Sequence, residues 1–186
     1  KLYEGNNARW AADYTRSLNN LAVSYSSVGR PEEAIPLAET ALAIREKLYK
    51  GNNDRWAEDY TWSLSYLAAS YKSVSRTEEA ISLQEAVLAI REKLYEGNND
   101  GWAADYTRSL NNLAASYTSV SRTEEAIPLQ EVALAITEKL YEERNDRWAE
   151  DYIITLNGLA ISYNLIDSTS EAISLAEAAL TIAEKF

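Results

Sequence analysis

The chain has 186 residues, of which 25% are charged and 46% are hydrophobic, a balance typical of a folded protein with a sizeable core. Its net charge of −11 repels nucleic-acid phosphates and anionic membrane surfaces, so we expect neither as a partner. The chain contains no histidine and no cysteine, which removes the usual proton shuttle, the thiolate nucleophile and the commonest zinc ligands. We therefore expect no enzyme activity, no metal site and no cofactor.

No apolar run in the sequence approaches the roughly 20 residues that span a bilayer, and no secretory leader is visible. These features favour a cytoplasmic protein. The opening letters "KLYEGNN" recur later inside the chain, so we expect this piece to come from a longer array.

Four tryptophans, Trp10, Trp56, Trp102 and Trp148, recur at a constant spacing of 46 residues. This spacing predicts four repeats, at residues 1–46, 47–92, 93–138 and 139–184, within one domain that covers residues 1–186. A unit of this length cannot enclose a core alone, and such repeats are typical of stacked helical arrays.

Each repeat contains two stretches with the periodicity of a helix. In the first repeat Trp10, Tyr14 and Leu21 are separated by multiples of three to four residues, so they would lie on one face of a helix. This pattern predicts a first helix, here called helix A. After the break "SVGRP", a second helix, helix B, is expected from about Glu32 to Tyr49. We expect helix A to be capped in later repeats by the acidic residue two positions before the tryptophan, namely Asp54, Asp100 and Asp146.

The pattern within each repeat resembles the tetratricopeptide repeat (TPR). The first repeat has the run Leu18-x-x-Leu21-Ala22-x-x-Tyr25, followed by Ala34 and Ala41, and the other three repeats match it. The resemblance implies an all-α fold, a right-handed α-solenoid of four helix-turn-helix repeats and eight helices. The repeat exceeds the ordinary length of 34 residues by 12, which implies longer helices and makes the chain similar to kinesin light chains and to arrays that accompany NB-ARC and CHAT proteins. A HEAT-type array would suit the length but lacks this spacing.

Residues that are constant among the repeats are expected to form the contacts between helices. The constant tryptophans and tyrosines of helix A, such as Trp56 and Tyr60, are predicted to pack against the "KLY" end of the preceding helix B. The alternative is that they form a row of platforms for a ligand. Glutamates of "EEAI" and "AIREK", with their Lys and Arg partners, are interpreted as solvated helix surfaces.

Residues of helix A that differ among repeats are the candidate binding site, because the resemblance implies that helix A lines a concave groove. None of these positions is acidic in a chain with 29 acidic residues, which favours an anionic partner segment. The predicted groove residues are Arg16, Asn19, Asn20, Trp62, Tyr66, Lys72, Arg108, Asn111, Asn112, Ile154, Asn157 and Ile161.

The asparagines could hold the backbone of an extended peptide, and Trp62 with Tyr66 could anchor an aromatic side chain. The alternative is that asparagine only solvates this face and Trp62 covers a neighbouring helix.

The expected function is a protein-interaction scaffold that binds an extended peptide or a partner protein's segment, acidic and aromatic in character. The alternative is a structural spacer or self-associating array without a peptide ligand. Apolar residues of the last repeat, such as Ile161, Leu165 and Ile166, suggest head-to-tail or dimeric self-association through uncapped ends.

Overall fold

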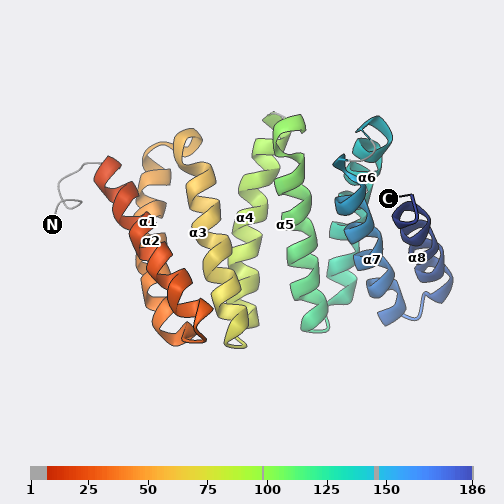
Figure 1. The fold of residues 1–186 in the computed structure, drawn as a ribbon, viewed down its shortest axis with the longest axis horizontal. Coiled ribbons are helices and arrows are strands. Elements are labelled where there is room, and N and C mark those ends of the chain that lie inside the picture. Colours follow the sequence, from red (N-terminus) through yellow and green to blue (C-terminus); the bar gives the residue numbers. More distant parts are fainter. Residues whose placement is uncertain (1–7, 98, 145–146, 186) are drawn as a thin grey trace. The chain divides into compact units, whose positions relative to one another are not determined.

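The computed structural model of the protein describes residues 8–97, 99–144 and 147–185. Within these ranges the chain forms eight α-helices in sequence order (Figure 1). Their bounds are α1 (Ala8–Ser27), α2 (Pro31–Gly51), α3 (Asn53–Ser73), α4 (Thr77–Gly97), α5 (Asn99–Ser119), α6 (Thr123–Arg144), α7 (Ala149–Leu165) and α8 (Thr169–Ala183). The expected all-α fold of paired helices is confirmed, with odd-numbered helices as helix A and even-numbered helices as helix B.

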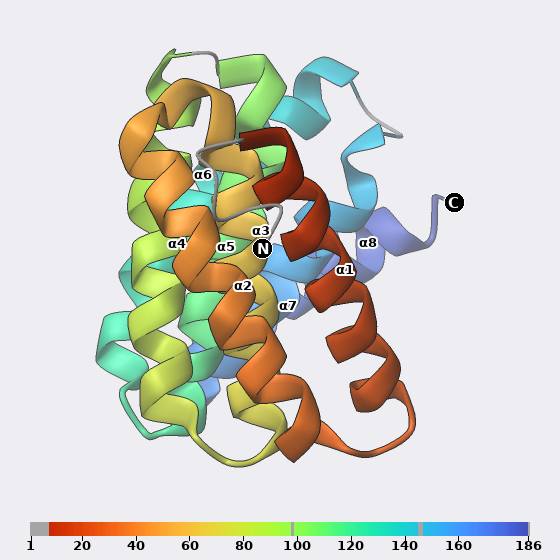
Figure 2. The same ribbon diagram turned by 90° about the vertical axis from the view of Figure 1, so that its left-hand side faces the viewer.

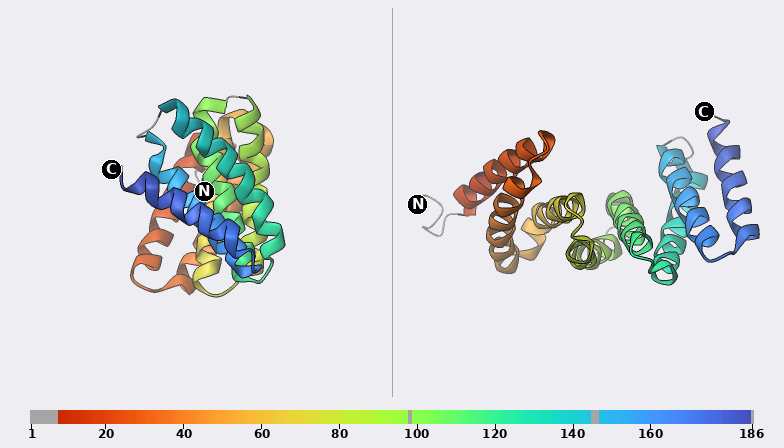
Figure 3. Two further views of the ribbon diagram at one scale, coloured as in Figure 1. Left: turned by 90° about the vertical axis from the view of Figure 1, so that its right-hand side faces the viewer. Right: turned by 90° about the horizontal axis from the view of Figure 1, so that it is seen from below.

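The chain divides into two compact units, residues 1–90 and 91–186, and this boundary falls within α4. In the first unit α1 packs on α2, and the two run in opposite directions (Figure 2). In the second unit α5 packs on α6, and α7 packs on both α6 and α8. Figure 3 shows the hairpin of α7 and α8. The single continuous domain expected from the sequence stays a prediction.

A left-handed residue ends every helix A. Gly29, Ser75, Ser121 and Asp167 have φ values of 74°, 62°, 63° and 60°. In the second repeat the amide of Arg76 donates to the carbonyl of Tyr71 at 2.9 Å, and the amide of Ser75 donates to Lys72 at 3.1 Å. This pair of bonds is the Schellman arrangement, which satisfies the last carbonyls of the helix and turns the chain into helix B.

Small side chains allow the two helices of a repeat to approach closely. Alanine at the positions of the repeat pattern is buried in all four repeats: Ala22, Ala34, Ala68, Ala80, Ala114, Ala126, Ala160 and Ala172. In the first unit Leu67 and Ile35 join this core beside Ala38. The TPR-like spacing of leucine, alanine and tyrosine therefore marks the packing of helix A on helix B.

The aromatic contacts predicted between repeats are present. Tyr49 at the end of α2 stacks on Tyr60 of α3, with ring centroids 4.8 Å apart. The equivalent pairs are Tyr95–Tyr106 at 5.0 Å and Tyr141–Tyr152 at 5.3 Å. These pairs support the structural interpretation of the constant aromatic residues.

The tryptophans are buried to different extents, which corrects the expectation of one uniform layer. Trp56 and Trp148 are buried and Trp102 is partly buried, whereas Trp10 is 47% exposed. Trp56 of α3 lies against the preceding helix B, with its ring centroid 5.8 Å from the guanidinium carbon of Arg45 on α2. Among the described residues no helix precedes α1, so Trp10 and Leu21 have no equivalent surface to cover.

The predicted aspartate caps are wrong where the structure describes them. Helix α3 begins at Asn53, and its cap is Asn52, whose side chain accepts a hydrogen bond from the amide of Arg55 at 3.2 Å. Asp54 and Asp100 therefore lie inside α3 and α5, and Asp146 lies outside the described residues. Helix α3 begins earlier than expected because Asn52 of its "GNN" segment supplies the capping side chain.

Candidate functional site

In the first unit the candidate residues come from one face of α1 and α3. The side-chain amide of Asn19 on α1 lies 3.5 Å from the Ser63 hydroxyl of α3, and the hydroxyls of Ser26 and Tyr66 are hydrogen-bonded at 3.2 Å. The two A helices of this unit are thus neighbours. We call the surface of helix A that carries the candidate residues the helix-A face.

A hollow of about 400 Å³ opens on this face of the first unit. Its lining consists of Arg16, Asn19, Asn20, Arg45, Arg55, Glu58, Asp59 and Trp62. Four of these residues belong to the predicted groove set. The residues that line the hollow include three arginines and two carboxylates, in a chain whose net charge is −11.

The exposed ring of Trp62 and the partly buried ring of Tyr66 form an aromatic pair beside this hollow. Their rings stack with centroids 5.7 Å apart and planes inclined by 7°. Trp62 remains 47% exposed, whereas Trp56 on the same helix is 8% exposed. The predicted difference between a constant, buried tryptophan and a variable, exposed one is therefore confirmed for α3.

Asn19 is buried, unlike an asparagine that binds a ligand on an open surface. It is only 2% exposed, and it donates to Ser63 while its Oδ1 receives no hydrogen bond from the described residues. In contrast, Asn20 is exposed at the same hollow. Asn19 therefore joins two A helices, and Asn20 is the asparagine that a partner could reach.

Arg45 is a residue of this site that the sequence interpretation missed. The sequence predicts a solvated helix surface at this position, but Arg45 is 3% exposed and lies at the hollow. Its Nη1 lies 2.7 Å from an oxygen of Asp59, and its Nη2 donates to the carbonyl oxygen of Ala12 at 3.3 Å. The spacing along helix B indicates that Arg45 is buried, because Arg45 follows the buried residues Ala34, Ala38 and Ala41 at intervals of three to four residues.

In the second unit the candidate residues lie on α5 and α7. Asn111 of α5 is partly buried and donates to the Thr155 hydroxyl of α7 at 2.9 Å, which is the same contact that Asn19 makes with Ser63. The residues Asn112, Ile154, Asn157 and Ile161 are exposed. Asn111 therefore holds neighbouring helices together, like Asn19, and the exposed set is more apolar than in the first unit.

The cations of the predicted groove carry partners. Arg16 lies 3.3 Å from Asp13, and Arg108 lies 3.4 Å from Asp105, each pair one helical turn apart. Lys72 is exposed near the end of α3. The surface ion pairs are worth little, since their side chains are largely solvated, and either arginine can leave its aspartate at small cost.

The described residues contain no group of three or more carboxylates placed to hold a metal ion. None of the described helices combines the length and apolar character needed to cross a membrane.

Comparisons with solved structures identify the same fold in other proteins. BtubC (BKLC) from P. vanneervenii is 23% identical, with a TM-score of 0.75 over 92% of this chain. Aspartyl phosphate phosphatase F from Bacillus subtilis is 16% identical, with a TM-score of 0.70 over 94% of this chain. The chain covers 63% and 41% of those two proteins, respectively. A putative kinesin light chain from Podospora anserina with nearly identical TPR-like repeats is 22% identical over 94% of this chain and 97% of that one, with a TM-score of 0.49.

None of the curated proteins compared with the chain matched it. Tetratricopeptide repeat family models match residues 15–54, 59–139 and 105–185, which together cover well over half of the chain. These matches agree with the buried alanines and the helix pairs described above. The chain therefore belongs to the tetratricopeptide repeat family.

Proposed function

We propose that the protein is a non-catalytic interaction scaffold that binds an extended acidic and aromatic segment of a partner protein on its helix-A face. Tetratricopeptide repeat arrays generally serve as protein-protein interaction scaffolds. The observation that carries the proposal is the hollow of the first unit, where three arginines lie near the exposed Trp62, which stacks on Tyr66.

Charge supports an acidic partner. The chain carries a net charge of −11, and its surface would repel such a segment almost everywhere. At the hollow, however, three guanidinium groups face two carboxylates. Arg45 is buried and paired with Asp59 at 2.7 Å, so the exposed Arg16 and Arg55 are the arginines that a partner can reach.

The aromatic pair supports an anchor residue. Large exposed aromatic side chains beside a hollow are typical of the residues that carry most of the binding free energy at interfaces. Trp62 lines the hollow directly, and its stacking on Tyr66 holds the ring in a fixed orientation. A partner's aromatic ring could therefore add to this stack while its carboxylates approach the arginines.

The test uses the fluorescein-labelled peptide Glu-Tyr-Asp-Glu-Tyr-Asp-Glu and measures its binding by fluorescence anisotropy. We expect Trp62→Ala to weaken binding by at least about tenfold, and Arg16→Gln by a few-fold, with a smaller dependence on salt. Trp10→Ala is the matched control, since Trp10 is equally exposed but does not line the hollow. Equal effects of the two tryptophan substitutions, or equal binding of a peptide with Gln and Asn in place of its acids, would contradict the proposal.

Self-association is a second candidate, and it is favoured by exposed apolar residues at positions that are buried in other repeats. Ile173 on α8 is 53% exposed, whereas the equivalent Ile35 and Ile81 are buried. On α1, Trp10 is exposed, whereas the equivalent Trp56 is buried. The α1 surface of one molecule could therefore cover α8 of another as α3 covers α2.

Sedimentation velocity over a range of protein concentrations tests this candidate. Self-association should grow with concentration, and Ile173→Glu should abolish it because a carboxylate would be buried in the contact. A monomer at every concentration would exclude it.

A further inference from the structure

Three turns between helices hold an arginine over a tyrosine ring. The guanidinium carbons of Arg30, Arg76 and Arg122 lie 4.8, 4.0 and 4.3 Å from the ring centroids of Tyr25, Tyr71 and Tyr117. Each arginine also pairs with the glutamate three residues later: Glu33, Glu79 and Glu125. In the fourth repeat the equivalent of these arginines is Ser168.

The second repeat shows how the guanidinium is held when it is present. Arg76 donates from Nε to Glu79 at 2.9 Å, and Tyr71, beneath it, donates from its hydroxyl to Glu39 at 2.7 Å. The hydrogen bond to Glu79 raises the pKa of Arg76 and lowers that of Glu79, and the charges of Tyr71 and Glu39 raise the pKa of Arg76 further. One guanidinium therefore stacks on a tyrosine ring and pairs with Glu79, and the charge of Glu39 stabilises it further.

The fourth repeat keeps the ring and both carboxylates without that cation. Tyr163 of α7 donates to Glu131 of α6 at 2.9 Å, as Tyr71 donates to Glu39. Glu171 of α8, the equivalent of Glu79, accepts a hydrogen bond from Ser170 at 2.6 Å. The pKa of Tyr163 is raised by its bond to Glu131, by burial and by the charges of Glu131 and Glu171.

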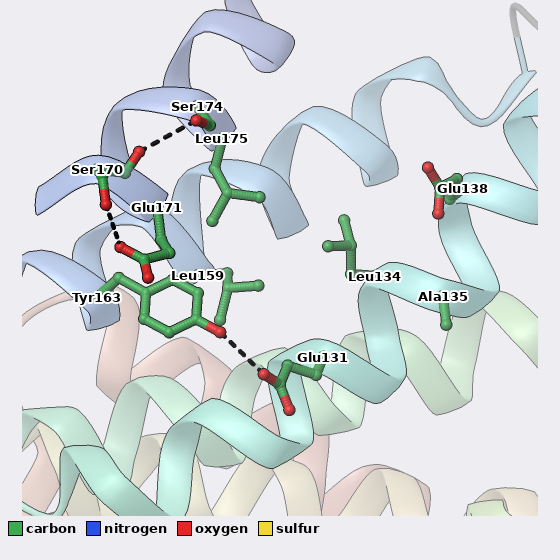
Figure 4. A pocket seen from close by; sticks show the side chains of 10 residues that line it. All are labelled: Glu131, Leu134, Ala135, Glu138, Leu159, Tyr163, Ser170, Glu171, Ser174 and Leu175. Atoms are coloured by element: carbon green, nitrogen blue, oxygen red, sulfur yellow. Dashed lines mark hydrogen bonds between the residues drawn. The ribbon is translucent and has the colours of Figure 1, made fainter. Parts of the chain in front are cut away.

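These groups surround a cleft of about 610 Å³ between α6, α7 and α8 (Figure 4). The apolar part of its lining comes from Leu134, Leu159 and Leu175, one leucine from each helix. Its charged lining residues are Glu131, Glu138 and Glu171, and none of its ten lining residues is basic. The volume lies within the range of sites that enclose a side chain or a small ligand.

We propose that this cleft binds an arginine of a partner protein, flanked by apolar residues, with the guanidinium placed at Tyr163 where Arg76 lies at Tyr71. The guanidinium stacks on the ring and donates to Glu171 and Glu131, and the apolar neighbours pack on the three leucines. Arginine fits better than lysine because its planar group stacks on an aromatic ring and binds carboxylates through two parallel donors. The site lies on α6 to α8 and does not depend on the helix-A face.

The test uses the full chain labelled with ¹⁵N and the probe peptide acetyl-Leu-Arg-Leu-amide. We expect saturable shifts of the backbone amides of Tyr163, Glu171 and Leu175. The same peptide with citrulline, which keeps the shape but lacks the charge, should bind at least about tenfold more weakly. The lysine peptide should bind with intermediate affinity.

The decisive variant is Ser168→Arg, which restores the arginine of the other repeats. Its side chain should occupy the site from within the chain, and the affinity for the arginine peptide should fall by at least about tenfold. Glu171→Gln should weaken binding several-fold, whereas Glu177→Gln, on α8 but outside the cleft, should not change it. Absence of binding by the unaltered chain, equal binding of the citrulline peptide, or unchanged binding by a folded Ser168→Arg variant would overturn the proposal.

Discussion

The ring of Tyr49 at the end of α2 stacks on the ring of Tyr60 in α3, with centroids 4.8 Å apart. Tyr95 and Tyr106 stack in the same way, and the equivalent Tyr141 and Tyr152 make a tilted contact with their ring planes inclined by 35°. Because these residues recur 46 positions apart, one favourable contact between helix B and the next helix A is made three times. The energetics of the array therefore depend on a repeated unit, and substitutions in different repeats can serve as controls for each other.

Trp56→Ala and Trp62→Ala should differ sharply although both residues lie in α3. Trp56 is buried, so its truncation leaves a cavity and should lower the free energy of unfolding by about 3–5 kcal/mol. Trp62 is half exposed, and its truncation should cost less than about 1 kcal/mol. Urea unfolding followed by circular dichroism measures both, and equal losses would refute the assignment of Trp56 to the core and Trp62 to the binding face.

Replacing a left-handed serine by glycine should stabilise the protein. Ser75 and Ser121 have φ values of 62° and 63°, a region in which a side chain is strained, and the first repeat has Gly29 at this position. Ser75→Gly should raise the free energy of unfolding by about 0.5–1 kcal/mol, and Gly29→Ala should lower it by about 1 kcal/mol. The effect of Gly29→Ala would come from the backbone alone, because no atom lies within 4 Å of an added Cβ. Thermal unfolding of the two variants checks the signs, and a loss of stability in Ser75→Gly would contradict this account.

Arg45→Ala should destabilise the first unit because it leaves Asp59 and the Ala12 carbonyl without their buried donor. The expected loss is about 2–4 kcal/mol, somewhat below that for a fully buried pair because Asp59 is partly exposed. Arg45→Met should recover much of it, since an apolar chain of similar length fills the space without an unpaired charge. Lys47→Ala, on the exposed side of α2, should change stability by less than about 0.5 kcal/mol. Chemical unfolding of all three variants would reject the buried-pair interpretation if Arg45→Ala and Lys47→Ala cost the same.

Two tyrosines should make the protein sensitive to alkaline pH. Burial, together with the nearby charges of Glu92 and Glu138, raises the pKa of Tyr106 and Tyr152 to about 12. In an unfolded chain the pKa is about 10, so the folded state holds these protons more tightly. Their contribution to stability is therefore fully present below about pH 10 and is lost as the pH rises to about 12.

Unfolding at a series of pH values, with tyrosinate absorbance at 295 nm, tests this dependence. Tyr106→Phe and Tyr152→Phe should each reduce the fall in stability between about pH 10 and 12, because phenylalanine does not titrate. An unchanged alkaline transition in both variants would show that other groups control it.

The sequence predicted the parts of the site that depend on position along a helix. The spacing of tryptophan, leucine and alanine predicts two helices per repeat, and the difference between constant Trp56 and variable Trp62 predicts which ring is buried. The sequence did not show that Asn19 is buried, because a single asparagine on a helix surface carries no sign of its partner. Ser63, which accepts its hydrogen bond, lies 44 residues away.

By itself, then, the sequence determined the repeat, the helices and the core alanines, because helical periodicity and a constant spacing can be recognised from the order of residues alone. Only the tertiary structure decided that Arg45 reaches Asp59 from a different helix and that α6, α7 and α8 enclose a cleft of about 610 Å³. Each of these depends on how closely two or three helices approach and at which turn. Those distances arise from side-chain packing in three dimensions, which the order of residues does not display.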